Sequence, residues 1–208
     1  MSLFVKLCGI ADEHHVEVAV EAGADAIGFV LTPSPRQVSL ERAARLRALL
    51  PDSVLGVAVF HDPSPALLRQ ALEVVGPDLL QSERSTLVGM PADRVLPVVV
   101  DGARLETDLA GAACSTTREM VLVDSAARGG TGRPAGWSRL AALDFTGLLI
   151  LAGGLNPENV ADAVDLVRPF GVDVSSGVES SPGVKDPEKM RAFVAAAREG
   201  GRKHDDHH

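Results

Sequence analysis

Two residues that could exchange protons with a substrate lie at the ends of apolar segments. Cys8 precedes Gly9 at the end of "LFVKLC" (3–8), and Asp124 ends "EMVLVD" (119–124). A cysteine thiolate can remove a proton from carbon, and a partly desolvated aspartic acid can hold a proton and donate it. Each residue also has a structural interpretation, Cys8 as a small core residue and Asp124 as a cap of the following loop. Their positions in the fold must separate these interpretations.

Two basic residues could bind anions near these positions. Arg36 lies in the loop "TPSPRQVS", in which two prolines restrict the backbone. A pre-ordered guanidinium suits bidentate binding of a carboxylate, although a loop arginine can equally be solvated. Lys6 stands two residues before Cys8, so both side chains point to the same face of a strand. A lysine buried there requires a nearby anion, whose identity the sequence leaves open.

Glycine-rich segments follow two further apolar runs. "AGGLNPEN" (152–159) and "SSGVE" (175–179) each place glycine after a strand pattern and before an expected helix start. Backbone N–H groups and helix N-termini can bind a phosphate dianion there without a lysine. The expected phosphate-binding residues are Gly153, Gly154, Ser176 and Gly177. A third segment, "GGTG" (129–132), is either a flexible lid or an anion cradle.

Regular elements must position these residues, and the chain alternates between two patterns. Short apolar runs predict strands at 3–8, 25–31, 53–60, 77–81, 94–100, 119–124, 147–153 and 171–175. Helical patterns occupy 12–23, 39–50, 62–76, 83–90, 103–113, 137–143, 156–167 and 186–200. Asp12 is the expected N-cap of the first helix. Asn156 is the expected N-cap before 157–167, with Pro157 at the first helical position.

This alternation determines the expected fold. Repeated strand-helix units favour parallel pairing through right-handed crossovers, and about 200 residues are the lower limit for closing eight of them. The sequence therefore predicts an α/β fold, a single-domain (β/α)8 TIM barrel over residues 1–200, with a flexible polar tail at 201–208. An open doubly wound sheet is the alternative. In a closed barrel the loops after the strands share one rim, which would bring Cys8, Arg36 and Asp124 together.

The composition favours a small-molecule partner over a polyanion or a membrane. The 208 residues carry a formal net charge of -8 and a pI near 5.2, and Lys and Arg form no basic stripe. Such a chain repels a phosphate backbone, so we expect no nucleic-acid partner. No apolar run reaches the roughly 18 residues of a membrane span, and no signal peptide is recognisable. We therefore expect a small phosphorylated substrate and no membrane association.

The cysteines and histidines indicate the compartment and the absence of a metal site. Cys8 and Cys114 lie far apart without a CxxC partner, which favours a reducing, cytoplasmic setting. Three of the six histidines lie in the tail "KHDDHH", and no second cluster with ligand spacing accompanies them. We expect no metal ion. The chain can be a monomer or a homodimer.

Five segments together resemble phosphoribosylanthranilate isomerase, a (β/α)8 enzyme family of tryptophan biosynthesis. These segments are "VKLCGI", "GADAIGFVLTPSPRQVS", "VLVDSAARGGTG", "LAGGLNPENV" and "GVDVSSGVESSPGVKD". They span nearly the whole chain in the family's order and spacing. The resemblance implies an Amadori rearrangement of N-(5-phosphoribosyl)anthranilate to 1-(2-carboxyphenylamino)-1-deoxyribulose 5-phosphate, without metal or organic cofactor.

The resemblance also assigns roles to the residues. Asp124 would protonate the ribose ring oxygen, and Cys8 as thiolate would remove the C2 proton of the resulting imine. Arg36 would hold the anthranilate carboxylate. The backbone around the phosphate-binding residues Gly153, Gly154, Ser176 and Gly177 would hold the phosphate at the other end of the substrate.

Some positions depart from the family pattern. The family carries "QLHG" at strand four, whereas this chain reads "LLQSE" (79–83), with Ser82 at the expected place of the histidine. We expect this change to weaken activity or to alter the aromatic pocket. Two other functions therefore stay open: a related isomerase of aminated sugar phosphates, or a barrel that binds a phosphorylated metabolite without catalysis.

Overall fold

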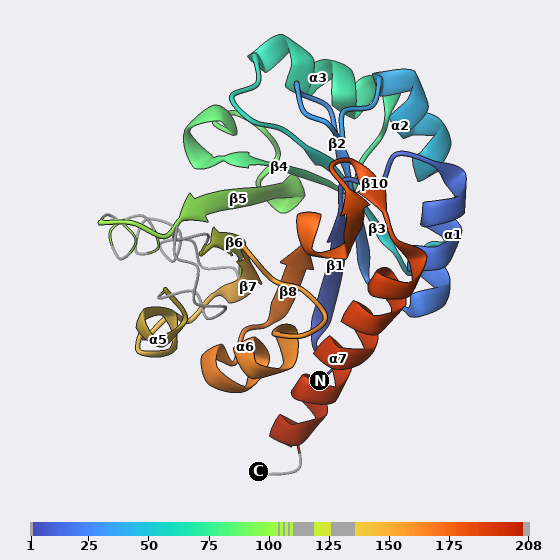
Figure 1. Ribbon diagram of the computed structural model, residues 1–208. Helices are drawn as coiled ribbons and strands as arrows, with labels where there is room; N and C mark the ends of the chain where they lie inside the picture. Colours follow the sequence, from blue (N-terminus) through green and yellow to red (C-terminus); the bar gives the residue numbers. More distant parts are fainter. Residues whose placement is uncertain are drawn as a thin grey trace.

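Eight parallel strands close into a barrel in the computed structural model of this chain (Figure 1). The structure describes residues 2–103, 105, 107, 109, 119–125 and 136–205. The strands are β1 (Phe4–Cys8), β2 (Ala26–Val30), β3 (Leu55–Val59), β4 (Leu79–Glu83), β5 (Val95–Val100), β6 (Met120–Asp124), β7 (Leu148–Ala152) and β8 (Gly171–Val174). They pair in chain order, and β8 returns to pair with β1. The predicted barrel is confirmed, and the open-sheet alternative is wrong.

Helices cover the outside of the strands. They are α1 (Glu13–Ala22), α2 (Leu40–Arg47), α3 (Pro65–Val74), α5 (Gly136–Ala141), α6 (Val160–Val167) and α7 (Pro187–Asp205). Short 3-10 turns are η1 (Arg84–Thr86), η2 (Ala92–Arg94) and η3 (Ser176–Val178), and β9 (Glu179–Ser181) forms a small hairpin with β10 (Val184–Lys185). Helix α7 packs against both α6 and α1, which closes the helical ring (Figure 1).

Side-chain alternation along the strands separates two apolar layers. One face of each strand packs against the helices, as Val5 and Leu7 of β1 do. The other face fills the barrel interior, where the buried cluster is almost entirely aliphatic: Ala26, Val57, Leu79, Leu96, Leu122, Ile150 and Ala152. This filling agrees with the low aromatic content of the chain and with the usual core of parallel barrels.

The caps of the helices agree with the sequence in one case and differ in another. Asp12 caps α1, and its side chain accepts a hydrogen bond from the His15 amide. The expected helix start at Asn156 is wrong, because α6 begins at Val160 with Asn159 at the N-cap. The side chain of Asn156 instead accepts hydrogen bonds from the amides of Glu158 and Asn159, which stabilises a turn before the helix.

Several boundaries differ from those expected. Strand β4 continues through Glu83, and the helix expected over 83–90 is only the turn η1. Helix α7 runs through Asp205, past the domain boundary expected at residue 200. The helix expected over 103–113 lies only partly within the described residues, and the "GGTG" segment (129–132) lies outside them.

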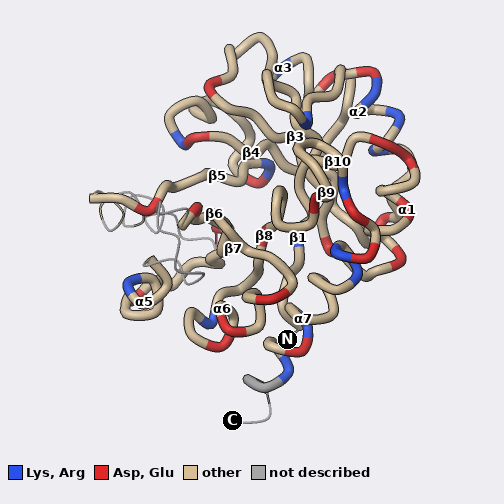
Figure 2. Tube along the Cα trace, viewed as in Figure 1, with Lys and Arg blue, Asp and Glu red and all other residues tan. Residues whose placement is uncertain are grey.

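The distribution of charged residues and of apolar helices can be followed along the described part of the chain. Figure 2 shows acidic and basic residues interspersed along the trace. Among the described helices, none is long and apolar enough to cross a membrane. The residues that the structure describes also contain no group of three or more His, Cys, Asp and Glu side chains that could hold a metal ion.

Candidate active site

Cys8 lies at the carboxyl end of β1 with its side chain toward the barrel interior. Its strand alternates, since Val5 and Leu7 pack against the helices. Cys8 is 6% exposed, and Gly28 of β2 is its cross-strand neighbour. A Cβ atom on Gly28 would lie 3.0 Å from the Cys8 sulfur, so glycine leaves the space that the thiol occupies. The position is that of a residue at the barrel mouth.

Asp124 lies at the carboxyl end of β6 and also faces the interior. Leu122, two residues earlier, belongs to the cluster inside the barrel, whereas Val121 and Val123 pack against the helices. The Asp124 side chain is half-buried. Strands β7 and β8 separate β6 from β1 around the barrel, so Cys8 and Asp124 approach the mouth from different sides.

Lys6 forms a buried ion pair beneath the Cys8 thiol. Its Nζ lies 2.7 Å from Oδ1 of Asp173 on the neighbouring strand β8, and no part of Lys6 is exposed. A Cβ atom on Gly28 would lie 3.2 Å from the same Nζ, so the ammonium and the thiol border one small space. Asp173 is therefore the anion that a buried Lys6 requires.

Burial and the neighbouring charges have opposing effects on the pKa of the Cys8 thiol. Burial raises the pKa of the thiol above its ordinary value, because a thiolate loses its hydration inside the barrel. The positive charges of Lys6 and Lys185 lower this pKa, while the Asp173 carboxylate raises it, and the net direction is upward. Burial would lower the pKa of Lys6, but the charges and hydrogen bonds of Asp173 and Cys8 together raise it above its ordinary value. Lys6 therefore stays charged beside the thiol.

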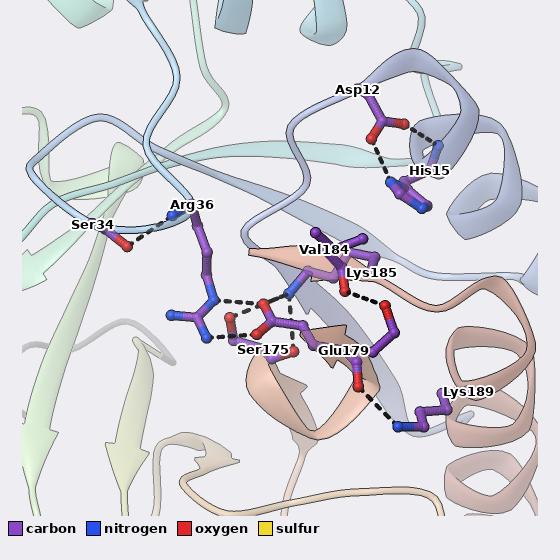
Figure 3. A network of polar contacts seen from close by, with 10 residues as sticks. Asp12, His15, Ser34, Arg36, Ser175, Glu179, Val184, Lys185 and Lys189 are labelled. Carbon is purple, nitrogen blue, oxygen red and sulfur yellow. Dashed lines mark hydrogen bonds and ion pairs between the residues drawn. The ribbon is translucent and has the colours of Figure 1, made fainter. Parts of the chain in front are cut away.

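Arg36 is held by a carboxylate of the protein itself. Its Nε donates to Oε1 of Glu179 at 2.6 Å and its Nη2 donates to Oε2 at 2.8 Å. Figure 3 shows the Arg36 and Lys185 side chains converging on this carboxylate. Lys185 Nζ lies 2.9 Å from Oε1 of Glu179 and donates to the Ser175 carbonyl at 2.9 Å. The pair joins the loop after β2 to the segment after β8.

The charges around Glu179 determine its ionisation. Burial alone would raise its pKa, but the hydrogen bonds from Arg36 and Lys185 and the charge of Lys185 lower it to about 2. The hydrogen bonds to Glu179 and its negative charge raise the pKa of Arg36 in turn. Two cations and one carboxylate leave this cluster with one net positive charge, which suits an anionic ligand.

Two glycines allow Arg36 to lie in this place. A Cβ atom on Gly9 would lie 2.6 Å from Cδ of Arg36, and Gly9 has a φ of +78°. A Cβ atom on Gly183, in the turn between β9 and β10, would lie 2.4 Å from the Pro35 carbonyl oxygen. The Arg36 side chain thus crosses the residue next to Cys8, and the β9–β10 hairpin packs against its loop.

The two expected phosphate-binding segments pack against each other. Gly153 and Gly154 have φ angles of +90° and +68°, which a residue with a side chain rarely adopts. A Cβ atom on Gly177 would lie 1.8 Å from the Leu155 carbonyl oxygen, so only glycine permits this contact. None of the N–H groups of these three glycines donates to another described residue. Helix α6 starts six residues after Gly154, so backbone amides of the loop, rather than the helix end, are the available donors.

Strand β4 places Gln81 and Ser82 on opposite faces. Leu79 fills the barrel interior and Leu80 packs against the helices, so Gln81 faces inward and Ser82 faces outward. Ser82, at the expected place of the family's histidine, is fully buried and accepts a hydrogen bond from the Thr86 hydroxyl. Gln81 is 7% exposed, and its Oε1 has no hydrogen-bond partner among the described residues.

Sequence reasoning missed three charged residues of this site: Asp173, Glu179 and Lys185. A buried Lys6 required an anion, but nothing in the sequence identified it as Asp173. Glu179 and Lys185 fall within the segments "SSGVE" and "PGVKD", next to the expected phosphate-binding residues. The sequence signal for Glu179 and Lys185 was their position shortly after the eighth strand, beside the expected phosphate-binding residues.

The chain is similar to known proteins along most of its length. Residues 5–196 match the family described as N-(5'phosphoribosyl)anthranilate (PRA) isomerase. An N-(5'-phosphoribosyl)anthranilate isomerase of Streptococcus pneumoniae (strain Hungary19A-6) is 41% identical over 203 residues, which cover 94% of this chain and 96% of that protein.

Two solved structures show the same likeness. A phosphoribosyl anthranilate isomerase in complex with reduced 1-(o-carboxyphenylamino)-1-deoxyribulose 5-phosphate has 37% identity and a TM-score of 0.78, over 95% of this chain and 99% of that chain. A structure of monomers generated from the dimeric phosphoribosylanthranilate isomerase of Thermotoga maritima has 36% identity and a TM-score of 0.77, with the same coverage. The chain therefore belongs to the N-(5'-phosphoribosyl)anthranilate isomerase family.

Proposed function

We propose that this protein catalyses the Amadori rearrangement of N-(5-phosphoribosyl)anthranilate to 1-(2-carboxyphenylamino)-1-deoxyribulose 5-phosphate in tryptophan biosynthesis. The observation that carries this proposal is the shared orientation of Cys8 and Asp124, each at the carboxyl end of a barrel strand with its side chain inward. Catalytic groups of such barrels occupy this position. The family relationship supports the substrate.

The reaction begins with opening of the ribose ring. Asp124, as an acid, donates its proton to the ring oxygen while the bond from that oxygen to C1 breaks, and the anilino nitrogen supplies the electron pair for an iminium at C1. Asp124 is left as a carboxylate. The half-buried position at a rigid strand end fixes the direction of this proton transfer.

Cys8 then acts as the base. Its thiolate removes the proton from C2, the C–H electrons form the C1–C2 double bond of an enolamine, and tautomerisation of the enolamine gives the ketone. Burial raises the pKa of the thiol and so disfavours the thiolate. The nearby positive charges of Lys6 and Lys185 stabilise the thiolate when it forms. All steps are proton transfers, so the mechanism requires no metal or organic cofactor.

The two ends of the substrate would be held apart. Arg36 would bind the anthranilate carboxylate, and backbone amides around Gly153, Gly154, Ser176 and Gly177 would bind the phosphate. The reacting carbons would then lie between these anchors, above Cys8 and Asp124. We further propose a cytoplasmic protein, either a monomer or a homodimer, without a nucleic-acid partner.

A kinetic assay tests the proposed function. Purified protein should convert N-(5-phosphoribosyl)anthranilate, and the loss of substrate fluorescence follows the reaction. Folded protein without turnover would contradict the proposal. Complementation separates the alternatives: rescue of a tryptophan auxotroph lacking this isomerase supports it, whereas rescue of only a histidine auxotroph favours the related sugar-phosphate isomerase. Binding of the product without catalysis favours the metabolite-binding barrel.

A further inference from the structure

We propose that Glu179 is a positioning residue that holds the Arg36 guanidinium in the orientation that binds the substrate carboxylate. This inference rests on the proposed function. It assigns a task to a carboxylate that neither the acid-base steps nor the phosphate site uses.

The geometry leaves one edge of the guanidinium for a ligand. A guanidinium offers five N–H donors, which form two parallel forks. Glu179 takes the fork of Nε and Nη2 at 2.6 and 2.8 Å. No described residue accepts a hydrogen bond from Nη1 of Arg36. A substrate carboxylate can therefore bind the Nη1 edge while Glu179 stays in place.

Glu179 is itself fixed from several directions. Its side chain is only 5% exposed, and Lys185, whose side chain is 1% exposed, contacts the carboxylate oxygen that Arg36 Nε also contacts. Its backbone carbonyl accepts a hydrogen bond from Lys189 Nζ at 2.8 Å. A carboxylate held in this way restricts the Arg36 side chain, which otherwise would have many rotamers to lose on binding.

Glu179 could instead weaken substrate binding, by competing for Arg36. A carboxylate already paired with Arg36 could compete with the substrate carboxylate, in which case its removal would tighten binding. Positioning and competition therefore predict opposite signs for one substitution. The Nη1 edge, from which no described residue accepts a hydrogen bond, favours positioning.

The substitution Glu179→Gln tests the sign, because the amide keeps the shape of the side chain but loses the charge. The binding of reduced 1-(o-carboxyphenylamino)-1-deoxyribulose 5-phosphate reports on both anchors, and inorganic phosphate reports on the phosphate site alone. We expect the reduced product to bind about 10-fold more weakly and phosphate less than about 2-fold more weakly. KM should rise by about 10-fold while kcat changes by less than about 3-fold. Tighter or unchanged binding of the reduced product would overturn the inference.

A double-mutant cycle tests whether Glu179 acts through Arg36. Arg36→Ala alone should weaken binding of the reduced product. If Glu179 acts only by holding Arg36, adding Glu179→Gln to Arg36→Ala should change the affinity by less than about 2-fold. A full, additive 10-fold loss in the double variant would show that Glu179 acts independently of Arg36 and would overturn the inference.

Two further variants keep the test decisive. Glu188→Gln removes an exposed carboxylate of α7 and should leave both affinities unchanged. Glu179→Asp retains the charge beside Lys185 but withdraws the carboxylate by one methylene, so it should also weaken binding of the reduced product. It replaces Glu179→Gln in the same measurements if circular dichroism shows that the glutamine variant does not fold. A wild-type protein that neither reacts nor binds the reduced product would overturn the proposed function itself, whereas wild-type binding with unaffected Glu179 variants would overturn only this inference.

Discussion

Lys6 and Asp173, on neighbouring strands, form an ion pair of 2.7 Å inside the barrel directly beside the Cys8 thiol. The lysine charge lowers the pKa of the thiol and the aspartate charge raises it. The two charges therefore partly cancel in their effect on the pKa of Cys8. An isolated lysine there would be too costly to keep charged. The pair therefore allows a cation to be placed below the proposed base.

Removal of the proposed acid or base should abolish most of the activity. We expect Cys8→Ala and Asp124→Asn each to lower kcat by at least about 100-fold, the usual scale of general acid-base catalysis. Steady-state assays of the two variants measure this loss, and circular dichroism controls for folding. A folded Cys8→Ala variant with kcat near that of the wild type would exclude the thiolate as base.

The pH dependence should follow the Cys8 thiol. Only the thiolate can accept a proton, so kcat/KM should rise with pH toward the pKa of Cys8, which burial raises above its ordinary value. Lys185→Met removes one of the charges that lower this pKa, and the rise should then move to higher pH. Arg191→Met is the control, because it also removes one positive charge, but Arg191 is exposed on α7 and pairs with Glu21. Identical profiles for these two variants would contradict this assignment.

The buried ion pair should be costly to break on one side. Lys6→Met leaves the Asp173 carboxylate buried without its partner, which we expect to lower the free energy of unfolding by about 3–5 kcal/mol. The double variant Lys6→Met/Asp173→Leu removes both charges and should recover much of this loss. Urea denaturation of the three proteins measures the difference. A double variant less stable than Lys6→Met would show that the pair is not the cause.

The contact between the two proposed phosphate-binding segments should tolerate only glycine. In Gly177→Ala the new Cβ would lie 1.8 Å from the Leu155 carbonyl oxygen, so the backbone of one segment must move. We expect KM to rise by about 10-fold or more, since misplaced groups lose their contacts to the phosphate. Gly102→Ala is a suitable control, because its Cβ would meet nothing closer than 3.8 Å. Equal KM values for the two alanine variants would argue against a phosphate site at Gly177.

The sequence by itself determined the barrel and the places of the proposed acid and base. Strand and helix patterns are local, so the alternation of apolar runs and helical segments predicted the eight strands. Parallel strands in a closed barrel share one carboxyl rim, and this rule places Cys8 and Asp124 there without further information. Helix starts were less predictable. Asn156 has the composition of an N-cap, but its side chain stabilises a turn, and the helix begins at Val160.

Only the tertiary structure decided which charges meet. Lys6 and Asp173 are 167 residues apart, and Arg36 and Glu179 are 143 residues apart. No local pattern encodes such pairs, because barrel closure and the packing of the β9–β10 hairpin against the Arg36 loop bring them together. The inward direction of Gln81 likewise depended on how β4 lies in the barrel. The interaction between two charged side chains depends on the distance between them in space. The number of residues between them along the chain does not determine that distance.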